Sequence, residues 1–257
     1  MKKIRVRHKH SGFSRFFTLA LLAGLWRVYD RRSRERIPGP EEVEDAEISA
    51  AYEWVTRMPQ MRLMRHFVVS RAAALQDHGQ AVDLGCGAGQ LVLELAQQAP
   101  GLHVTGIDLS EKLLAFARQS AGQGGLEERV DFRLGNVEEI PFPDGLLDLV
   151  ISTFSLHHWT DPVKVLNEVD RVLKPGGAFY IFDLRRDLAL PFYLLIWFGT
   201  QFVVPAALHR VNEPMGTRNA SYIVQELVDL AQQSRLRGGQ VTAGPIWIVL
   251  EGKKRVA

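Results

Sequence analysis

A chain of 257 residues with 46% hydrophobic and 23% charged residues has the composition of a globular protein and can bury a full core. Its single cysteine, Cys86, excludes an intrachain disulfide and fits a reducing compartment. The overall charge of +2 hides an asymmetry, because residues 1–36 contain eleven Lys or Arg and two acidic residues (+9), which leaves −7 for the rest. A basic arm on an acidic body indicates an anionic partner for the arm, such as a membrane surface or nucleic acid.

The basic arm contains one apolar run, FFTLALLAGLW, over residues 16–26. Eleven residues are too few to cross a bilayer, which needs about 20. The aromatic residues and the dense Arg/Lys flanks favour a helix lying on an anionic lipid surface. A helix packed on its own domain is equally compatible with the pattern, and a cleaved secretory signal fits it less well. The breaker cluster RIPGPEE from Arg36 marks the end of the arm and predicts a boundary between 1–36 and 37–257.

After the arm, helical spacing over 41–77 gives way to alternating strands and helices. The expected strands are AVDLG from Ala81, HVTGIDL from His103, VDFRLG from Val130, LLDLVIST from Leu146, AFYIFDL from Ala178 and GPIWIVLEGKK from Gly244. The expected helices are QLVLELAQQA from Gln90, SEKLLAFARQSA capped by Ser110, DPVKVLNEVDRVL opened by Asp161 and Pro162, and residues 221–233. A KPGG turn is expected before the strand at Ala178. This alternation predicts an α/β fold with a parallel sheet covered by helices on both faces.

One long segment, residues 188–208, contains no charged residue. Its length alone nominates a transmembrane helix. Pro191, Gly199 and Pro205 interrupt it, however, and a further part of the domain follows. Its aromatic side chains suit either a buried lid over an apolar cavity or a segment that dips into a bilayer, and both readings stay open.

The glycines of VDLGCGAGQL, at positions 85, 87 and 89, follow a strand and precede a helix. Such positions need a positive φ or the close approach of a ligand to the backbone, near the positive end of the helix. The spacing is G-x-G-x-G, with Gln90 where a dinucleotide site has its third glycine. Asp83 would repel a pyrophosphate, whereas a ligand with a positive centre tolerates it. Asp108, at the end of the next strand, is well placed to accept from ribose hydroxyls.

These segments, followed in order by LGNVEEIPFPDGLLDLVISTFSLHHWTDP and VLKPGGAFYIFD, resemble the successive motifs of class I S-adenosylmethionine-dependent methyltransferases. The resemblance is strongest to the small-molecule group that includes the ubiquinone/menaquinone-biosynthesis enzymes, and it covers about residues 80–184. It implies a Rossmann-like, mostly parallel seven-stranded sheet with helices on both faces, joined to an N-terminal helical arm. It also implies a cofactor core at 80–184 and a substrate or lid region at 185–235.

The resemblance further implies roles for residues at matching positions, with S-adenosyl-L-methionine as the cofactor. Asp83 and the loop of Gly85, Cys86, Gly87 and Gly89 hold the methionine part, Asp108 holds the ribose, Leu109 lies beside the adenine, Asn136 and Val137 lie at its edge, and Ser152 and Thr153 lie where the cofactor and the substrate meet. Asn136 stands where the family commonly has Asp, and its amide oxygen is expected to accept from the adenine amino group instead. No metal site is expected.

A histidine pair, His157 and His158 in SLHHW, supplies candidate general bases after the fourth strand. The alternative is a structural role, since LHHW-like stretches occur in family members with different substrates. Tyr193, His209 and Tyr222 are further candidates for lining the acceptor pocket.

The expected function is methyl transfer by in-line displacement to a small, lipophilic acceptor reached from a membrane surface, through contacts at 1–36 and 188–208. The protein is therefore expected in the cytoplasm, peripheral on the inner face of a membrane. The alternatives are a non-catalytic binding protein of the same fold and, less favoured, an NAD-dependent oxidoreductase. The acidic body lacks a basic stripe, which argues against a specific nucleic-acid partner. The acceptor, the atom methylated and the oligomeric state are left undetermined by the sequence.

Overall fold

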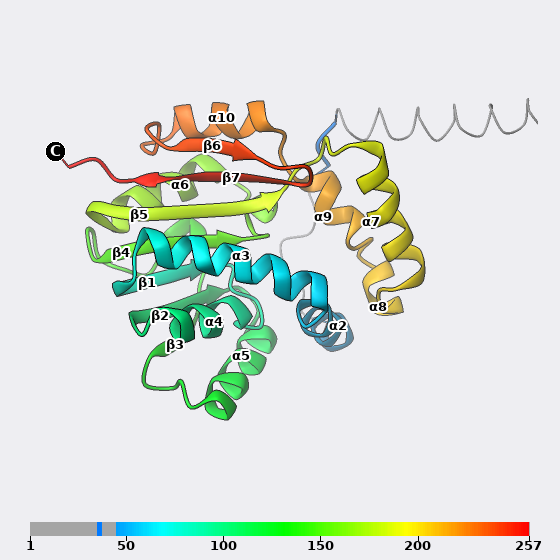
Figure 1. Cartoon of the computed structure of the whole chain (residues 1–257), viewed down its shortest axis with the longest axis horizontal. Helices are drawn as coiled ribbons and strands as arrows, with labels where there is room; N and C mark the ends of the chain where they lie inside the picture. The colour runs from blue at the N-terminus through cyan, green and yellow to red at the C-terminus, as the bar shows by residue number, and fades with distance from the viewer. Residues whose placement is uncertain (1–34, 38–44, 257) are drawn as a thin grey trace, which may run out of the picture.

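The computed structural model describes residues 35–37 and 45–256, which contain a seven-stranded sheet in the order β3-β2-β1-β4-β5-β7-β6 (Figure 1). The strands are β1 (His78–Leu84), β2 (Gly101–Asp108), β3 (Val130–Leu134), β4 (Leu147–Thr153), β5 (Leu173–Leu184), β6 (Gln240–Ala243) and β7 (Trp247–Lys253). All neighbouring strands are parallel except β7, which is antiparallel to β5 and β6. The predicted mostly parallel, seven-stranded sheet is confirmed.

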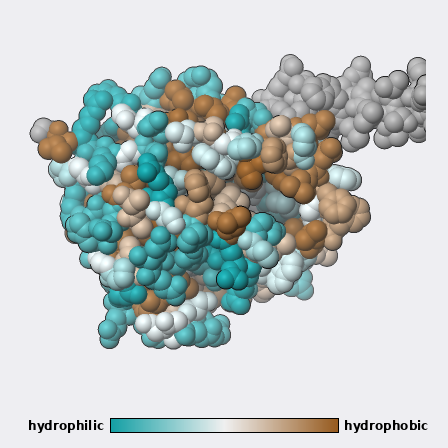
Figure 2. All heavy atoms as spheres, viewed as in Figure 1, coloured by the Kyte–Doolittle hydropathy of each residue, from teal (hydrophilic) through white to brown (hydrophobic). Residues whose placement is uncertain are grey.

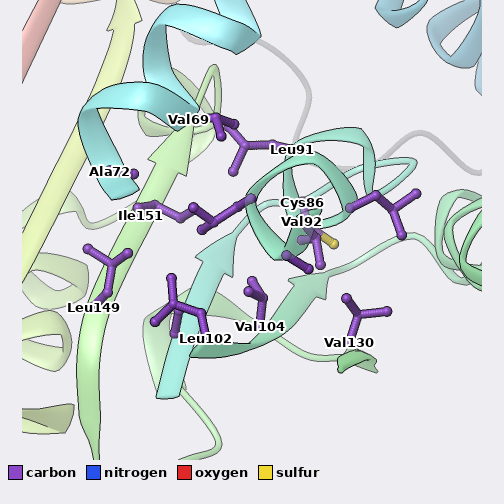
Figure 3. Packing of buried hydrophobic residues seen from close by; sticks show 14 of the residues in the cluster. Val69, Ala72, Cys86, Leu91, Val92, Leu102, Val104, Val130, Leu149 and Ile151 are labelled. Atoms are coloured by element: carbon purple, nitrogen blue, oxygen red, sulfur yellow. The ribbon is translucent and has the colours of Figure 1, made fainter. Parts of the chain in front are cut away.

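Helices cover both faces of this sheet, as predicted. The helices of the described residues are α2 (Ala46–Thr56), α3 (Pro59–Leu75), α4 (Gln90–Gln98), α5 (Glu111–Gly124), α6 (Pro162–Val172), α7 (Leu190–Phe202), α8 (Ala206–His209), α9 (Met215–Ala220) and α10 (Val224–Gln233), and the 3-10 turns are η1 (Val137–Glu139) and η2 (Leu156–His158). Apolar residues of α3, α4 and α5 pack on one face, and those of α6 and α10 pack on the other. Figure 3 shows the first of these cores, where Val69 and Ala72 of α3 lie with Leu91 and Val92 of α4 over the sheet.

The predicted helix caps are present, but the predicted KPGG turn is wrong. Ser110 accepts from Leu113 N at the start of α5, and Asp161 accepts from Lys164 N at the start of α6. The KPGG segment instead forms the irregular first part of β5, with Gly176 at φ +82°. Its backbone partner is Lys254, whose N–H donates to the Gly177 carbonyl at 2.8 Å. A local reading of the sequence misses a partner so distant along the chain.

The uncharged run 188–208 is divided between α7 and α8 and does not form one long helix. No helix in the described part of the chain is long and apolar enough to cross a membrane. The apolar run 16–26 lies outside the described residues, so the expected interfacial helix and the domain boundary at 36/37 stay predictions.

The order of the strands reverses between β1 and β4, which are neighbours in the sheet although β2 and β3 separate them in sequence. In open α/β sheets, ligands bind at the carboxyl ends of the strands beside such a switch point. Figure 1 shows α2, α7, α8 and α9 gathered at the end of the sheet toward which β5 points. Among these, α9 packs against η2, the turn that follows β4, and α2 packs against α8. We call residues 185–223, which contain α7, α8 and α9, the lid segment; they lie at this end of the sheet, and the covering role expected for 185–235 stays a prediction.

Candidate cofactor and acceptor site

The loop between β1 and α4 contains the three glycines, all with positive φ: +73° at Gly85, +53° at Gly87 and +74° at Gly89. Their surroundings differ. A Cβ on Gly89 would lie 2.6 Å from the Ala117 Cβ of α5, so Gly89 permits helix packing. A Cβ on Gly87 would meet nothing within 4 Å. Gly87 therefore leaves bare backbone facing open space, which is the surface that a ligand needs.

Asp108 at the end of β2 binds this loop. Its carboxylate accepts from Gly87 N at 2.8 Å and from Ser110 N at 2.9 Å. Burial raises the pKa of Asp108, although these backbone N–H groups act in the opposite direction. The residue predicted to hold a ribose thus also fixes the conformation of the glycine loop, a second role that its sequence position did not reveal.

Asp83 near the end of β1 is almost fully buried, and its Oδ1 has no hydrogen-bond partner among the described residues. Burial, followed by the neighbouring Asp108 carboxylate, raises the pKa of Asp83 to about 8. A buried acid next to another acid is satisfied when a cationic group arrives. The pair therefore fits a ligand that carries a positive charge beside a ribose.

Other predicted cofactor residues already have contacts within the protein. The Asn136 side-chain oxygen accepts from Glu138 N at 2.8 Å, while Leu109 is exposed and Val137 packs partly into the core. Ser152 is buried and donates from Oγ to the Leu84 carbonyl at 2.9 Å, which joins β4 to β1.

The Cys86 side chain lies in the core, as Figure 3 shows, and its Sγ occupies the space where a Cβ on Gly106 would fall. Burial raises the pKa of the Cys86 thiol well above its usual value, as do, to a lesser extent, the carboxylates of Asp108 and Asp83. Its backbone is bonded within the protein as well, because the Cys86 N–H donates to the Ile107 carbonyl at 2.9 Å and the Cys86 carbonyl accepts from Gly89 N at 3.0 Å.

The two predicted histidines have different environments. His157 is 1% exposed, and its Nδ1 lies 2.9 and 3.0 Å from the two carboxylate oxygens of Asp183 at the end of β5. Because a carboxylate only accepts, Nδ1 carries a proton, so the lone pair of the neutral imidazole lies on Nε2. The Nε2 atom is buried and has no hydrogen-bond partner among the described residues. His158 is half-buried, and its ring centroid lies 4.1 Å from that of His157.

The lid carries a buried acid of its own, Glu213, between α8 and α9. Its carboxylate accepts from Thr217 Oγ1 at 2.5 Å and also from the Tyr52 hydroxyl of α2. Burial raises the pKa of Glu213, partly offset by the Thr217 hydroxyl and then by the charge of His157. Glu213 is therefore a second buried polar group, besides His157, at this end of the sheet.

The three residues predicted to line the acceptor pocket differ in burial. Tyr193 and Tyr222 are buried. The guanidinium of Arg218 lies 5.1 Å from the centroid of the Tyr193 ring. The guanidinium of Arg36 lies 4.3 Å from the centroid of the Tyr222 ring. His209 is exposed. Tyr193 and Tyr222 thus lie within the lid, and His209 lies on its outside.

Three unpartnered polar side-chain atoms belong to residues at the sheet edge beside the switch point. Five buried side-chain N or O atoms in the described residues lack a hydrogen-bond partner, and three of them are Asp83 Oδ1, Thr153 Oγ1 and His157 Nε2. Asp83 and Thr153 end the neighbouring strands β1 and β4, and His157 follows in η2. Leaving such groups unpaired costs free energy. Their grouping at one edge indicates a place where a ligand supplies the missing partners.

Sequence reasoning missed Asp183, Glu213 and Arg36. Asp183 had a usable signal, because an acid at the end of the fifth strand shares an edge with the histidines after the fourth. Glu213 and Arg36 had no such signal, since each reaches the site through contacts far apart in the sequence.

Comparisons with known proteins agree with this geometry. A methyltransferase domain family matches residues 82–181. The ubiquinone/menaquinone biosynthesis C-methyltransferase UbiE of Geobacter sp. (strain M21) is 30% identical over 162 residues, which are 62% of this chain and 68% of that protein. The demethylmenaquinone methyltransferase of Symbiobacterium thermophilum is 34% identical over 136 residues, 52% of each chain. This chain spans about half the length of the first curated relatives that it matches.

The fold is also shared with solved structures. The crystal structure of a SAM-dependent methyltransferase from Aquifex aeolicus has a TM-score of 0.58 and 19% identity, and the match covers 82% of this chain and 100% of that one. At this identity the likeness concerns the fold, and it confirms the Rossmann-like architecture expected from the sequence.

Proposed function

Because the chain belongs to the class I S-adenosylmethionine-dependent methyltransferases, of the type that includes ubiquinone/menaquinone biosynthesis C-methyltransferases, we propose that it methylates a small apolar acceptor. The observation that carries this proposal is the group of unpartnered polar atoms at the ends of β1 and β4, with the lid above them. One part of the group fits a cationic cofactor, and the other part, His157, fits an acceptor that loses a proton.

The residues of the cofactor half fit S-adenosyl-L-methionine. When bound, this cofactor supplies a methyl group on a positively charged sulfur. Asp108 accepts from the ribose hydroxyls, Asp83 balances the positive charge of the methionine part, and bare backbone at Gly87 permits close approach. Leu109, Asn136 and Val137 flank the adenine in this proposal.

On the acceptor half, His157 acts as the general base. Its Nε2 would take the proton from a hydroxyl or an acidic carbon of the acceptor as that atom bonds to the methyl carbon; the methyl–sulfur bond breaks, and its electron pair stays on the sulfur, which leaves as a neutral thioether. The Asp183 carboxylate holds the ring in the required tautomer and stabilises the imidazolium that forms. His158 packs on this ring and supports its orientation.

The acceptor proposed is a lipophilic aromatic compound of the demethylated quinone class. Support comes from the name of the Symbiobacterium relative and from the apolar inner part of the lid, where Leu188, Tyr193 and Met215 pack together. An apolar cluster close to one base is typical of a site that removes water from its substrate.

We also propose that the lid docks on a lipid surface. The outer face of α7 exposes Leu195 (66%), Phe198 (53%) and Phe202 (68%), and Figure 2 shows hydrophobic side chains gathered over this helix. Monomeric proteins rarely expose large apolar patches without a partner. The arm, residues 1–36, carries a charge of +9. This charge suits anionic lipid, and contact with lipid would bring a lipophilic acceptor to the protein.

Two measurements test the enzymatic proposal. Calorimetry with S-adenosylmethionine, its demethylated product and NAD should show binding of the first two, whereas preference for NAD would overturn the proposal in favour of an oxidoreductase. Labelled methyl transfer from S-adenosylmethionine to detergent-dispersed demethylmenaquinone should then be observed. Binding without transfer to this or to any compound in a lipid extract would indicate the non-catalytic alternative.

Liposome flotation tests the lipid contact. Full-length protein should float with anionic vesicles, and a Leu195→Ser, Phe198→Ser, Phe202→Ser variant should float much less. Val256→Ser removes an equally exposed apolar side chain near the end of the described chain and should change nothing. Equal flotation of the α7 variant and the Val256 control would remove the lid from the proposed contact.

A further inference from the structure

The base of the N-terminal arm is fixed to the acceptor side by Arg36. Its Nε donates to the Ala220 carbonyl at 2.6 Å, and its Nη2 donates to the His157 carbonyl at 2.9 Å. The guanidinium carbon also lies 4.3 Å from the centroid of the Tyr222 ring. Beside it, Ile37 N donates to the Asn219 carbonyl at 3.0 Å, and Figure 1 shows this short blue segment next to α9.

These contacts join α9 of the lid to the η2 turn. Ala220 ends α9 of the lid, and His157 lies in η2 beneath it. The last carbonyls of a helix lack partners within the helix, and they favour a cation. A planar guanidinium presents several N–H donors in fixed directions, so one side chain can bind both carbonyls and still stack on Tyr222.

We propose that Arg36 is a positioning residue for methyl transfer, which holds η2 against α9 so that the His157 ring keeps the orientation needed to take the acceptor proton. The proposal rests on the proposed function of His157 as the base. It also connects the arm to the site, because the residue that sets this geometry lies at the end of the segment expected to contact lipid.

The contacts restrict the effect of Arg36 to the acceptor side. Its partners lie in η2, α9 and Tyr222, whereas the cofactor residues Asp83 and Asp108 lie on β1 and β2. Loss of Arg36 is therefore expected to change kcat and the KM for the acceptor, and to leave the Kd for the cofactor unchanged.

The chain is expected to fold without Arg36, because a second arginine holds the segment that follows α9 from the core. Arg186 is fully buried, and its guanidinium donates to the Ser221 carbonyl at 2.5 Å and to Glu226 Oε1 at 2.6 Å. Its backbone N–H also donates to the Tyr222 carbonyl at 3.3 Å. Removing Arg36 thus leaves the 221–226 segment attached to β5.

The kinetic test compares Arg36→Gln, Arg36→Lys and the control Arg71→Gln, which removes an arginine bound to Glu251 on the α3–β7 side. With demethylmenaquinone as acceptor, Arg36→Gln should lower kcat at least about tenfold, while the calorimetric Kd for S-adenosylmethionine stays within about twofold. Arg36→Lys keeps the charge but cannot span both carbonyls, so it should recover only part of the rate. Equal kcat in Arg36→Gln and Arg71→Gln, or full recovery by lysine, would overturn the positioning role.

A second readout needs no acceptor. In protein labelled with 15N at histidine, wild-type His157 should give one set of ring signals with a proton on Nδ1 at the pH of the assay. Arg36→Gln should shift or broaden the His157 signals, and Arg71→Gln should leave them unchanged. An unchanged His157 spectrum in Arg36→Gln would refute the proposal. If Arg36→Gln alters this spectrum but the wild type methylates no acceptor, the proposed function fails and with it the role of Arg36 in methyl transfer, while its control of the His157 ring orientation stands.

Discussion

The two halves of the site are built in opposite ways. The cofactor half consists of one short loop and the ends of β1 and β2, and it is held by bonds such as that from Gly87 N to Asp108. The acceptor half brings together segments from the arm, η2, β5 and the lid, including Arg36, His157, Asp183 and Glu213. The first half is a local structure, and the second depends on contacts between residues more than 100 positions apart.

This difference has a chemical counterpart. The cofactor half must recognise one ligand, and a backbone loop with two acids is sufficient for that. In the proposed function, the acceptor half must exclude water around a base, which would require a lid that covers the ring of His157 and moves to admit an acceptor. The following substitutions separate the halves, because each should affect one and spare the other.

The largest effect is expected from His157→Gln, which should lower kcat by about 10² to 10⁴ because the general base is lost. The Kd for S-adenosylmethionine should stay within about twofold, since the cofactor contacts lie on β1 and β2. His209→Gln, in the exposed part of the lid, is the matched control and should keep its rate. Steady-state kinetics with labelled cofactor provides the measurement; a His157→Gln enzyme with normal kcat would assign this ring a structural role.

Asp108→Asn should weaken cofactor binding by about a hundredfold, the loss of about 3 kcal/mol from charge-assisted bonds to the ribose. The N–H groups of Gly87 and Ser110 bind different oxygens of Asp108, so asparagine keeps one of these two bonds and is the mildest substitution for the loop. Asp131→Asn, on the exposed side of β3, serves as the control. Calorimetry at one pH compares the three proteins, and equal affinities would refute the ribose assignment.

Cofactor binding should become tighter as the pH rises from 6 toward 8. In the free protein the pKa of Asp83 is raised to about 8, so the acid is mostly protonated at neutral pH. A bound cation stabilises the carboxylate, so binding releases this proton, and affinity should rise by up to about tenfold per pH unit below the pKa. Calorimetry in two buffers of different ionisation enthalpy counts the released proton. The Asp83→Asn protein should release none, and an identical pH profile in both proteins would contradict the role given to Asp83.

The smallest effect is expected from Gly87→Ala, which should lower the free energy of unfolding by about 1 to 2 kcal/mol. This loss comes from the positive φ alone, because the added methyl group meets no neighbour. Its cofactor affinity should nevertheless fall, since that open space belongs to the ligand. Gly89→Ala should be less stable than Gly87→Ala, because its methyl group collides with Ala117. Urea unfolding ranks the two variants; the reverse ranking would show that the loop glycines were assigned the wrong roles.

The same contrast explains what the sequence predicts. The glycine loop, Asp83 and Asp108 are set by residues near one another in the chain, and their positions followed from spacing alone. The mostly parallel seven-stranded sheet and both helix caps also followed from local pattern and family resemblance. Arg36 and Glu213 did not, because nothing in their neighbourhoods indicates which carbonyl or hydroxyl they meet after folding. The KPGG segment failed for the same reason, since its partner Lys254 lies after β7.

The position of β7 also affects the order in which the molecule can be assembled. β7 lies between β5 and β6, and Lys254 pairs with Gly177 at the start of β5. During synthesis, β1 to β4 can pair as they emerge, but one edge of β5 stays open until residues 247–254 have left the ribosome. An unpaired apolar edge is a template for association with other chains. A nascent chain stalled before β7 is therefore expected to bind chaperones or aggregate, although its cofactor loop is already complete.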